Sequence, residues 1–551
     1  MNAAANKTVP KKKVAAKKIA AKPLPKKKPV KKKIGVTATN SKKSKKDNNP
    51  YQWKDHTGDF QNPNSEKPFL EHAGVQRNAT HVNTPIEAFK LFVTDEIAQQ
   101  IVTESNRYHD QMSDPREKWI PITAGDLYAF LGVTIAMGVV RLPEIEHYWR
   151  KDGICNMPWF SSVMSVKRYK EILRYLHLTD NNNVPDKNAP NYKLLKLGGL
   201  DRKLCDIFPS IYVPRQELSV DEQMVGTKCR ISFIQYMPKK PEKFGLKIWS
   251  LCEARTGYCL QFQVYTGKEN VQEKGLTHRV VTDLLKDRYY HKNHHVYFDN
   301  FFTTIPLMND LADNSTYSCG TIRSDRGKFP LSFKDAKLER GESVFVSTGN
   351  HLAVHWKDKR DVFVTSTIHG NGVENVQRRG EVAEITKPTM VCQYNQYMNG
   401  VDRCDQYIST YSMQRKTLKW WKKLFFRLIE LSIVNSMIVF YKLLPDQLPK
   451  SRVHKSYRLR LVNDLVQPLL DECNSHTSGR TKRPGNGADR LKGKHFPSSK
   501  HPIRKCCAVC AYVRRANGTQ SRKKTSCYCS KCDKFICKKC FEKFHTKSNA
   551  K

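Results

Sequence analysis

The sequence is short of acidic residues, and its first stretch has none: no Asp or Glu precedes Asp47. Across 551 residues, 52 Asp and Glu stand against 96 Lys and Arg, which gives a formal net charge of +44. So large an excess of positive charge indicates a polyanionic partner, most plausibly nucleic acid. A chain of this length predicts about three or four domains.

Long apolar runs are also missing. No run reaches the length of a membrane span and no secretory signal opens the sequence, so no membrane partner is expected. The most apolar segment, residues 428–441, is interrupted by Glu430 and Asn435 and predicts a core helix. Of 17 cysteines, eight lie between Cys506 and Cys540 and the others stand singly. Without a secretory signal this cluster indicates metal binding rather than disulfides.

Three segments have compositions typical of disordered, partly ordered or linker sequence. Residues 1–47 are lysine runs punctuated by Ala, Pro and Val, and we predict disorder there because such a segment buries little apolar surface. Residues 48–83 are polar and predicted to be partly ordered. The lysine runs are compatible with a nuclear address, a DNA-binding arm or a solubilising tail. Residues 474–504 are rich in Ser, Gly, Pro and basic residues and predict a linker.

Between these segments, helices and strands alternate in a defined order. Residues 84–212 are mainly helical, beginning with a cap at Thr84, Pro85 and Glu87. Three β-rich runs follow at 218–225, 246–252 and 258–265. A helix (276–287), a strand ending at Asp299, a helix (304–313) and a strand (317–322) come next. This order predicts a mixed sheet with helices on its faces, an α/β class.

Acidic residues stand out in this basic chain at three places. Asp299 ends a buried strand, and Asp221 lies inside the first strand, where a charge is costly unless it is paired or binds a metal. Asp402 and Asp405 are three apart and would share one face of a helix. Singly, each is more often a turn or cap residue. Jointly, they predict a Mg²⁺ site that acts on phosphodiesters.

At this point the sequence resembles the piggyBac transposase family, over roughly residues 84–545. The resemblance rests on several motifs in the same order: 219–224, 238–247, 298–303, 400–402 with 405–406, 415–417 followed by Trp420, and the terminal cysteine cluster. It implies an RNase H-like core split by a β-rich insertion, flanked by a helical DNA-binding and dimerisation domain. The implied segments are an N-terminal region (1–83), a helical domain (84–216 and 412–473), a core (217–325 and 386–411), the insertion (326–385), a linker (474–504) and a zinc domain (505–551).

Carried over residue by residue, the resemblance implies that Asp221, Asp299 and Asp402 are DDD-type catalytic carboxylates that hold Mg²⁺ or Mn²⁺, with Asp405 as an additional acid. It implies cut-and-paste transposition in the nucleus: nicking of transposon ends, hairpin formation and joining to a TTAA target by a homodimer. Trp420 matches an aromatic residue near the cleaved double-stranded DNA, although a core tryptophan is the alternative. The expected DNA contacts are Lys243, Lys247, Arg415, Lys416, Trp420, Lys423, Arg514 and Arg515.

The terminal cysteines form three C-x-x-C half-sites followed by a histidine. Tetrahedral zinc takes four nitrogen or sulfur ligands, so this set suits two Zn²⁺ ions in a cross-brace. The expected ligands are Cys507, Cys510, Cys529, Cys532, Cys537, Cys540 and His545, with Cys506 and Cys527 as further candidates. DNA binding is favoured for this domain over a RING-like ligase or a histone reader, because the preceding domains process DNA. The alternative for the whole chain is a domesticated derivative that binds DNA or chromatin without transposition.

Overall fold

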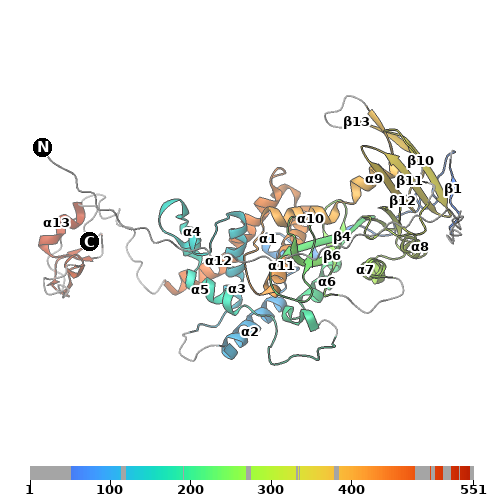
Figure 1. Ribbon diagram of the computed structural model, residues 1–551. Coiled ribbons are helices and arrows are strands. Elements are labelled where there is room, and N and C mark those ends of the chain that lie inside the picture. The colour runs from blue at the N-terminus through green and yellow to red at the C-terminus, as the bar shows by residue number, and fades with distance from the viewer. Residues whose placement is uncertain are drawn as a thin grey trace, which may run out of the picture. The chain divides into compact units, whose positions relative to one another are not determined.

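The computed structural model describes residues 51–56, 58–112, 119–189, 192–267, 275–330, 333, 336–377, 384–477, 495, 497, 503–512, 523–530, 532 and 534–546. The predicted disorder of residues 1–47 and most of the predicted linker lie outside these residues. The largest element of the fold is a ten-stranded mixed sheet (Figure 1).

The centre of this sheet has the strand order of an RNase H core. Strand β4 (Glu217–Gly226) pairs antiparallel with β6 (Phe244–Glu253), which pairs antiparallel with β7 (Cys259–Val264). On its other side, β4 pairs parallel with β8 (His295–Phe298), and β8 pairs parallel with β9 (Tyr317–Thr321). The first three strands form a meander, and helices α7 (Leu276–Leu285) and α8 (Ile305–Asp313) precede β8 and β9. The predicted α/β class is confirmed in this arrangement.

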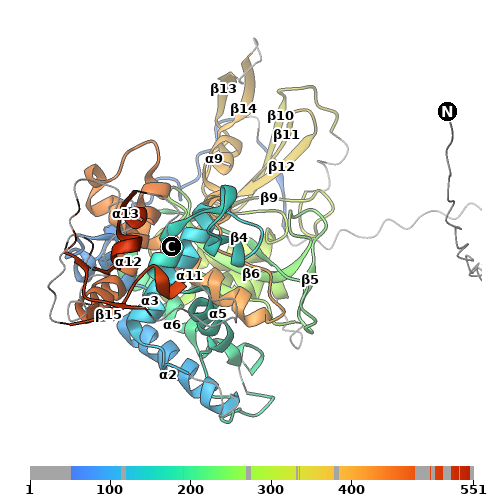
Figure 2. The ribbon, with the colours of Figure 1, turned by 90° about the vertical axis from the view of Figure 1, so that its left-hand side faces the viewer.

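The β-rich insertion continues the core sheet. Strands β10 (Ser343–Thr348), β11 (His351–Lys357) and β12 (Asp361–Ser366) form a meander, and β12 pairs antiparallel with β9. After these three strands, β13 (Val373–Gln377) and β14 (Glu384–Pro388) form a separate hairpin that is not part of the large sheet (Figure 2). The insertion is therefore β-rich, as expected, and these three strands extend the core sheet.

Residues 51–56 and 58–83 are more ordered than their polar composition suggests. Strand β1 (Lys54–Asp55) pairs with β10 at the edge of the large sheet, and β2 (Gly74–Val75) pairs with β3 (Tyr212–Val213). Buried asparagine amides hold the segment: Asn62 donates to the carbonyl of Asn350 at 2.9 Å, and Asn64 to that of Thr367 at 3.0 Å. Side-chain amides that bond distant backbone thus order a segment that has few apolar residues.

The helical domain is built from two stretches of the chain that flank the core. The cap predicted at Thr84 is present as a capping box with Glu87, and Thr123 with Asp126 forms a second capping box. The helices that carry Gly132 and Val466 pack closely, because a Cβ added at Gly132 would lie 2.8 Å from the Val466 side chain. The helices of this domain are α1 (Pro85–Lys90), α2 (Asp95–Met112), α3 (Ala124–Val139), α4 (Pro158–Val163), α5 (Val166–Tyr175), α6 (Leu200–Ile211), α11 (Trp420–Leu443) and α12 (Val453–Thr477).

Helix α11 is the core helix that the interrupted apolar segment predicts. Among the described residues it is the one helix long and apolar enough to cross a membrane, and 94% of its apolar window is buried inside the protein. Its polar residues have partners there. Asn435 donates to the carbonyl of Cys259 at 2.8 Å and accepts from the Cys259 amide at 2.9 Å. A side chain of the helix thus completes the hydrogen bonding of the first residue of β7.

Candidate active site and metal centres

Asp221 and Asp299 occupy corresponding positions on two adjacent parallel strands, Asp221 within β4 and Asp299 directly after the last residue of β8. Val220 on β4 is paired with Phe298 on β8, and the residue that follows each of them in the sequence is a candidate catalytic aspartate. β8 consists of four buried residues with β propensity, and Asp299 begins the turn that follows it, where its carboxylate accepts from the Phe301 amide at 2.9 Å. A carboxyl end of parallel strands is the usual position of a site in such a sheet.

Burial makes both carboxyl groups reluctant to ionise without a cation. Burial and the neighbouring charge of Glu222 raise the pKa of Asp221 to about 8. Burial also raises the pKa of Asp299, with Glu222 adding to the effect. Buried carboxylates that repel one another in this way are stabilised when a cation binds among them. The donor set and its charge therefore fit a divalent metal with a preference for oxygen.

Two lysines extend into this acidic cluster. Lys247 on β6 is 8% exposed, and its Nζ lies 3.9 Å from Glu222 Oε2 and 4.4 Å from the centre of the Phe301 ring. Burial lowers the pKa of Lys247, whereas the charges of Glu222, Asp221 and Asp299 raise it. Lys240 donates to the carbonyl of Glu222 at 3.0 Å. The site thus combines carboxylates with positive charge that can meet a phosphate.

Helices α9 (Thr389–Tyr397) and α10 (Gly400–Thr410) bring the later acids to the sheet. α10 packs against β4 and β6, and it carries Asp402 in its first turn and Asp405 one turn on. The close approach depends on Gly400: an added Cβ would lie 2.3 Å from Ser219 Oγ and 3.0 Å from the carbonyl of Glu253. The helix predicted from residues 400–406 therefore lies against the strand that carries Asp221.

Asp405 has a partner that the sequence did not reveal. Its carboxylate forms an ion pair with the Arg427 guanidinium of α11, whose side chain is 8% exposed. Burial raises the pKa of Asp405, while Arg427 lowers it. Among the described residues, groups of three or more His, Cys or carboxylate ligand atoms within 4.8 Å of one another occur twice, and neither group includes these aspartates. The catalytic and metal-binding roles of the four aspartates stay predictions.

The residues expected to contact DNA lie in very different surroundings. Lys243 and Lys416 are exposed, and Trp420 packs edge-on against Phe233 with ring centres 5.3 Å apart. Lys423 is partly buried, and burial lowers its pKa. Arg415 donates to the carbonyls of Leu142 and Met137 at 2.9 and 3.0 Å, beyond the end of α3 and within its last turn. Arg514 and Arg515 lie outside the described residues.

The C-terminal residues gather into two ligand clusters. Cys507, Cys510, Cys537 and Cys540 form the first, with the Cys510 sulfur 3.8 Å from that of Cys537 and 3.6 Å from that of Cys540. Two sulfurs on one edge of a zinc tetrahedron with 2.3 Å bonds would lie about 3.8 Å apart. Burial alone would raise the pKa of Cys507, but hydrogen bonds from backbone amides, including those of Cys510 and Cys537, lower it to about 7. A thiolate at this position suits zinc.

The second cluster contains His495, a ligand that the sequence pattern does not indicate. His495 Nδ1 lies 3.5 Å from the Cys529 sulfur and 3.4 Å from that of Cys532, and His545 Nε2 lies 3.3 Å from the Cys532 sulfur. Cys506 and Cys527 belong to neither cluster. His495 stands alone in the basic linker, without a second ligand at C-x-x-C spacing. The two clusters alternate along the chain, as a cross-brace requires.

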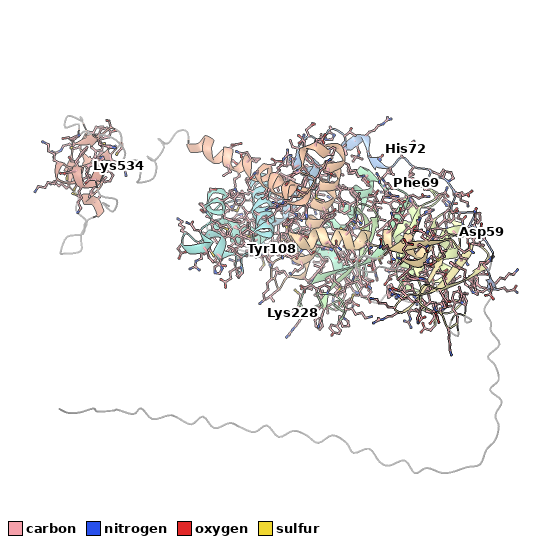
Figure 3. All side chains as sticks on the ribbon, turned by 90° about the horizontal axis from the view of Figure 1, so that it is seen from above. Asp59, Phe69, His72, Tyr108, Lys228 and Lys534 are labelled. Carbon is pink, nitrogen blue, oxygen red and sulfur yellow. The ribbon has the colours of Figure 1, made fainter. Side chains whose placement is uncertain are left out.

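The described residues of this domain form two short hairpins, β15 (Lys505–Cys506) with β16 (Lys524–Thr525) and β17 (Tyr528–Cys529) with β18 (Lys534–Phe535). They also form a short 3-10 helix (Cys510–Tyr512) and α13 (Lys538–Thr546). Figure 3 draws its side chains, with Lys534 of β18 labelled. Its apolar core is small and includes five of the cysteines together with Ile536, Phe541 and Phe544. Metal ligands are what such a small domain needs for stability.

Comparisons with known proteins agree with this architecture. A family model described as Transposase IS4 matches residues 84–437, well over half of the chain. The human PiggyBac transposable element-derived protein 3 is 28% identical over 494 residues, which cover 85% of this chain and 77% of that protein. The human Chimeric ERCC6-PGBD3 protein is also 28% identical over 494 residues, but the chain spans only 43% of it.

A solved structure supports the fold. A piggyBac transposase synaptic complex with hairpin DNA, determined by cryo-EM, matches with a TM-score of 0.68 and 23% identity, over 85% of this chain and 98% of that one. A split RNase H-like core with flanking helices defines the class as a transposase fold. The chain belongs to the piggyBac-type transposase family, as its motifs predicted.

Proposed function

We propose that this protein is an active piggyBac-type transposase that cuts and joins DNA with Mg²⁺ or Mn²⁺. One observation carries the proposal: Asp221 and Asp299 are adjacent on parallel strands of an RNase H-ordered sheet, and the helix with Asp402 packs on the same strand. Bound there, divalent cations would supply Lewis acidity that activates a nucleophilic oxygen and stabilises the leaving oxygen.

The residues of the site would then have two roles, metal binding and compensation of phosphate charge. Asp221, Asp299 and Asp402 would hold the metal ions. Lys247 and Lys240, which already lie among these acids, would offset the charge of the phosphate beside the cut. Because all steps of cut-and-paste transposition are in-line displacements at phosphorus, one such site suffices for nicking, hairpin formation and joining.

The partners follow from the same proposal. The net charge of +44 suits double-stranded DNA and predicts binding that weakens strongly with salt. The resemblance supports a homodimer that acts in the nucleus, on transposon ends and a TTAA target. We assign one zinc ion to each C-terminal cluster and propose that this domain helps to bind the transposon ends.

The test is metal-dependent nicking by the full-length protein. The substrate is a labelled duplex copied from the sequence that flanks the coding region and extends past the nearest TTAA. With Mg²⁺, wild type should nick one strand at the TTAA boundary, and Asp299→Asn should reduce the rate by about a hundredfold or more, because a carboxylate ligand is lost.

Asp313→Asn is the matched control. This exposed carboxylate at the end of α8 is close to Asp299 in sequence but outside the site, so its loss should leave the rate unchanged. If folded wild-type protein nicks neither flanking sequence faster than Asp299→Asn does, the proposal is contradicted. A domesticated DNA-binding protein would then be favoured.

A further inference from the structure

Next to the candidate active site, four charged side chains of alternating sign form a series, and all of them except Asp405 are buried. It starts at Asp405 on α10, continues through Arg427 and Glu430 on α11, and ends at Arg458 on α12. Glu430 and Arg458 are completely buried and Arg427 is 6% exposed. The series joins the acidic face of the core to both late helices of the helical domain.

The same groups hold the segment that connects α10 to α11. Glu430 accepts from the Met413 amide at 2.7 Å and from the Gln414 side chain at 3.4 Å. Arg458 donates to the Tyr411 carbonyl at 3.1 Å and to His454 at 2.7 Å. The charged series therefore fixes both the end of α10 and the turn that leads to Trp420.

Such a series is unfavourable unless it is complete. Each ion loses its hydration on burial, and its neighbours compensate only while every partner is present. Two nitrogen atoms within it, Arg427 Nε and Arg458 Nη2, are buried without a hydrogen-bond partner among the described residues. A fold optimised for stability alone would have apolar side chains here, so retention of the charges indicates a positional requirement.

We propose that Arg427 is a positioning residue of the active site: it holds Asp405 through their ion pair and, with Glu430 and Arg458, fixes the orientation of α10 so that Asp402 meets Asp221 and Asp299. Asp405 therefore acts by anchoring its helix, not as a metal ligand. The helical domain and the catalytic core are coupled through this series. The inference rests on the proposed function for its activity measurement, but its metal-binding measurement is independent of DNA cleavage.

The experiment compares Arg427→Met, Arg427→Lys and Asp405→Asn in the zinc-loaded full-length protein. Arg460→Met is the control, because Arg460 lies two residues from Arg458 on α12 and bonds Gln447 outside the series. Mn²⁺ binding is measured by calorimetry without DNA, with Asp299→Asn as the blank. Nicking of the flanking duplex is measured in single turnover against Mn²⁺ concentration.

Arg427→Met should raise the Mn²⁺ concentration for half-saturation about tenfold and lower the nicking rate by about 10–100-fold, as loss of a group that supports metal ligands does. Arg427→Lys should fall between wild type and Arg427→Met, because lysine keeps the charge but not the planar fork. Asp405→Asn should shift half-saturation in the same direction, and Arg460→Met should match wild type.

A purely structural role would give a different pattern. Arg427→Met would then melt at a lower temperature, while its folded fraction bound Mn²⁺ and nicked DNA with wild-type half-saturation, and the inference would be overturned. If wild type binds Mn²⁺ and Arg427→Met weakens it, but neither protein nicks DNA, the positioning role holds and the proposed function fails. If both nick equally, the proposed function holds and the positioning role fails.

Discussion

Replacing Gly400 by alanine should separate α10 from the sheet and inactivate the site. The added Cβ would lie 2.3 Å from Ser219 Oγ, and 3.0 Å from Ala254 Cα and from the carbonyl of Glu253. Carbon atoms in contact prefer about 3.5–4.0 Å, so relief requires a shift of about 1 Å at the start of α10. Overpacking of this kind costs about 1–3 kcal/mol of folding free energy.

The functional cost should exceed the cost in stability. Asp402 lies two residues after Gly400, and a misplacement of about 1 Å can lower a rate by about a hundredfold. We therefore expect Gly400→Ala to remain folded, with a modestly lower melting temperature, and to nick the flanking duplex about a hundredfold more slowly in single turnover.

A second substitution tests the cause. Ser219 Oγ is buried and has no hydrogen-bond partner among the described residues, so Ser219→Ala should cost little alone. Combined with Gly400→Ala it removes the nearest clash and should restore part of the rate, while the two 3.0 Å backbone contacts remain. Gly125→Ala is the control, because the nearest atom there is Thr123 Oγ1 at 3.6 Å. Wild-type nicking by Gly400→Ala, or no recovery in the double variant, would refute the steric explanation.

Three further predictions concern stability and metal content. Burial lowers the pKa of Lys422 from its unfolded value of 10.5 to about 7. Between these pH values the folded state binds fewer protons than the unfolded state, so Lys422 should make the free energy of unfolding rise with pH by up to about 5 kcal/mol. Urea unfolding of Lys422→Met should show a flatter pH dependence over this range, and equal slopes for the two proteins would contradict the prediction. Cys537→Ser should lose zinc by elemental analysis, whereas Cys506→Ser should keep the wild-type content; equal loss would contradict the ligand clusters. Asn435→Leu leaves both backbone groups of Cys259 without partners and should cost about 2–3 kcal/mol in urea unfolding, and an unchanged midpoint would contradict this role for Asn435.

The core of the fold could be predicted from local sequence. Strand 218–225 corresponds to β4, and the strand that ends at Asp299 corresponds to β8, because each is a short run of β-formers between turn signals. The order of elements predicted Asp221 within the first strand and Asp299 at the end of the fourth, and the parallel pairing of β4 with β8 makes these strands neighbours. Pairing of the insertion with β9 could not be predicted, since hydrogen bonding between distant edge strands leaves no local pattern.

The burial of particular charged residues could not be predicted from the sequence. Lys422 and Arg427 are basic residues near the start of α11, and nothing in their sequence spacing distinguishes them from exposed lysines and arginines. In the fold, Lys422 donates to the carbonyls of Leu173 and Arg174, and Arg427 pairs with Asp405. Their partners lie on other elements, so helical periodicity alone cannot distinguish a buried cation from an exposed one. His495 was missed for a related reason, because its co-ligands are more than thirty positions away.

The short strand β1 has a consequence for the behaviour of the protein in solution. It covers the outer edge of β10, whose neighbouring residues Val344, Phe345 and Val346 are apolar. An uncovered strand of this kind offers unpaired amides and carbonyls to a second chain, and natural proteins protect such edges with short charged strands. Lys54 and Asp55 provide that protection. A protein shortened past residue 56 would keep every candidate catalytic residue but would expose an unpaired strand edge. Such a protein should aggregate even though its catalytic residues are intact.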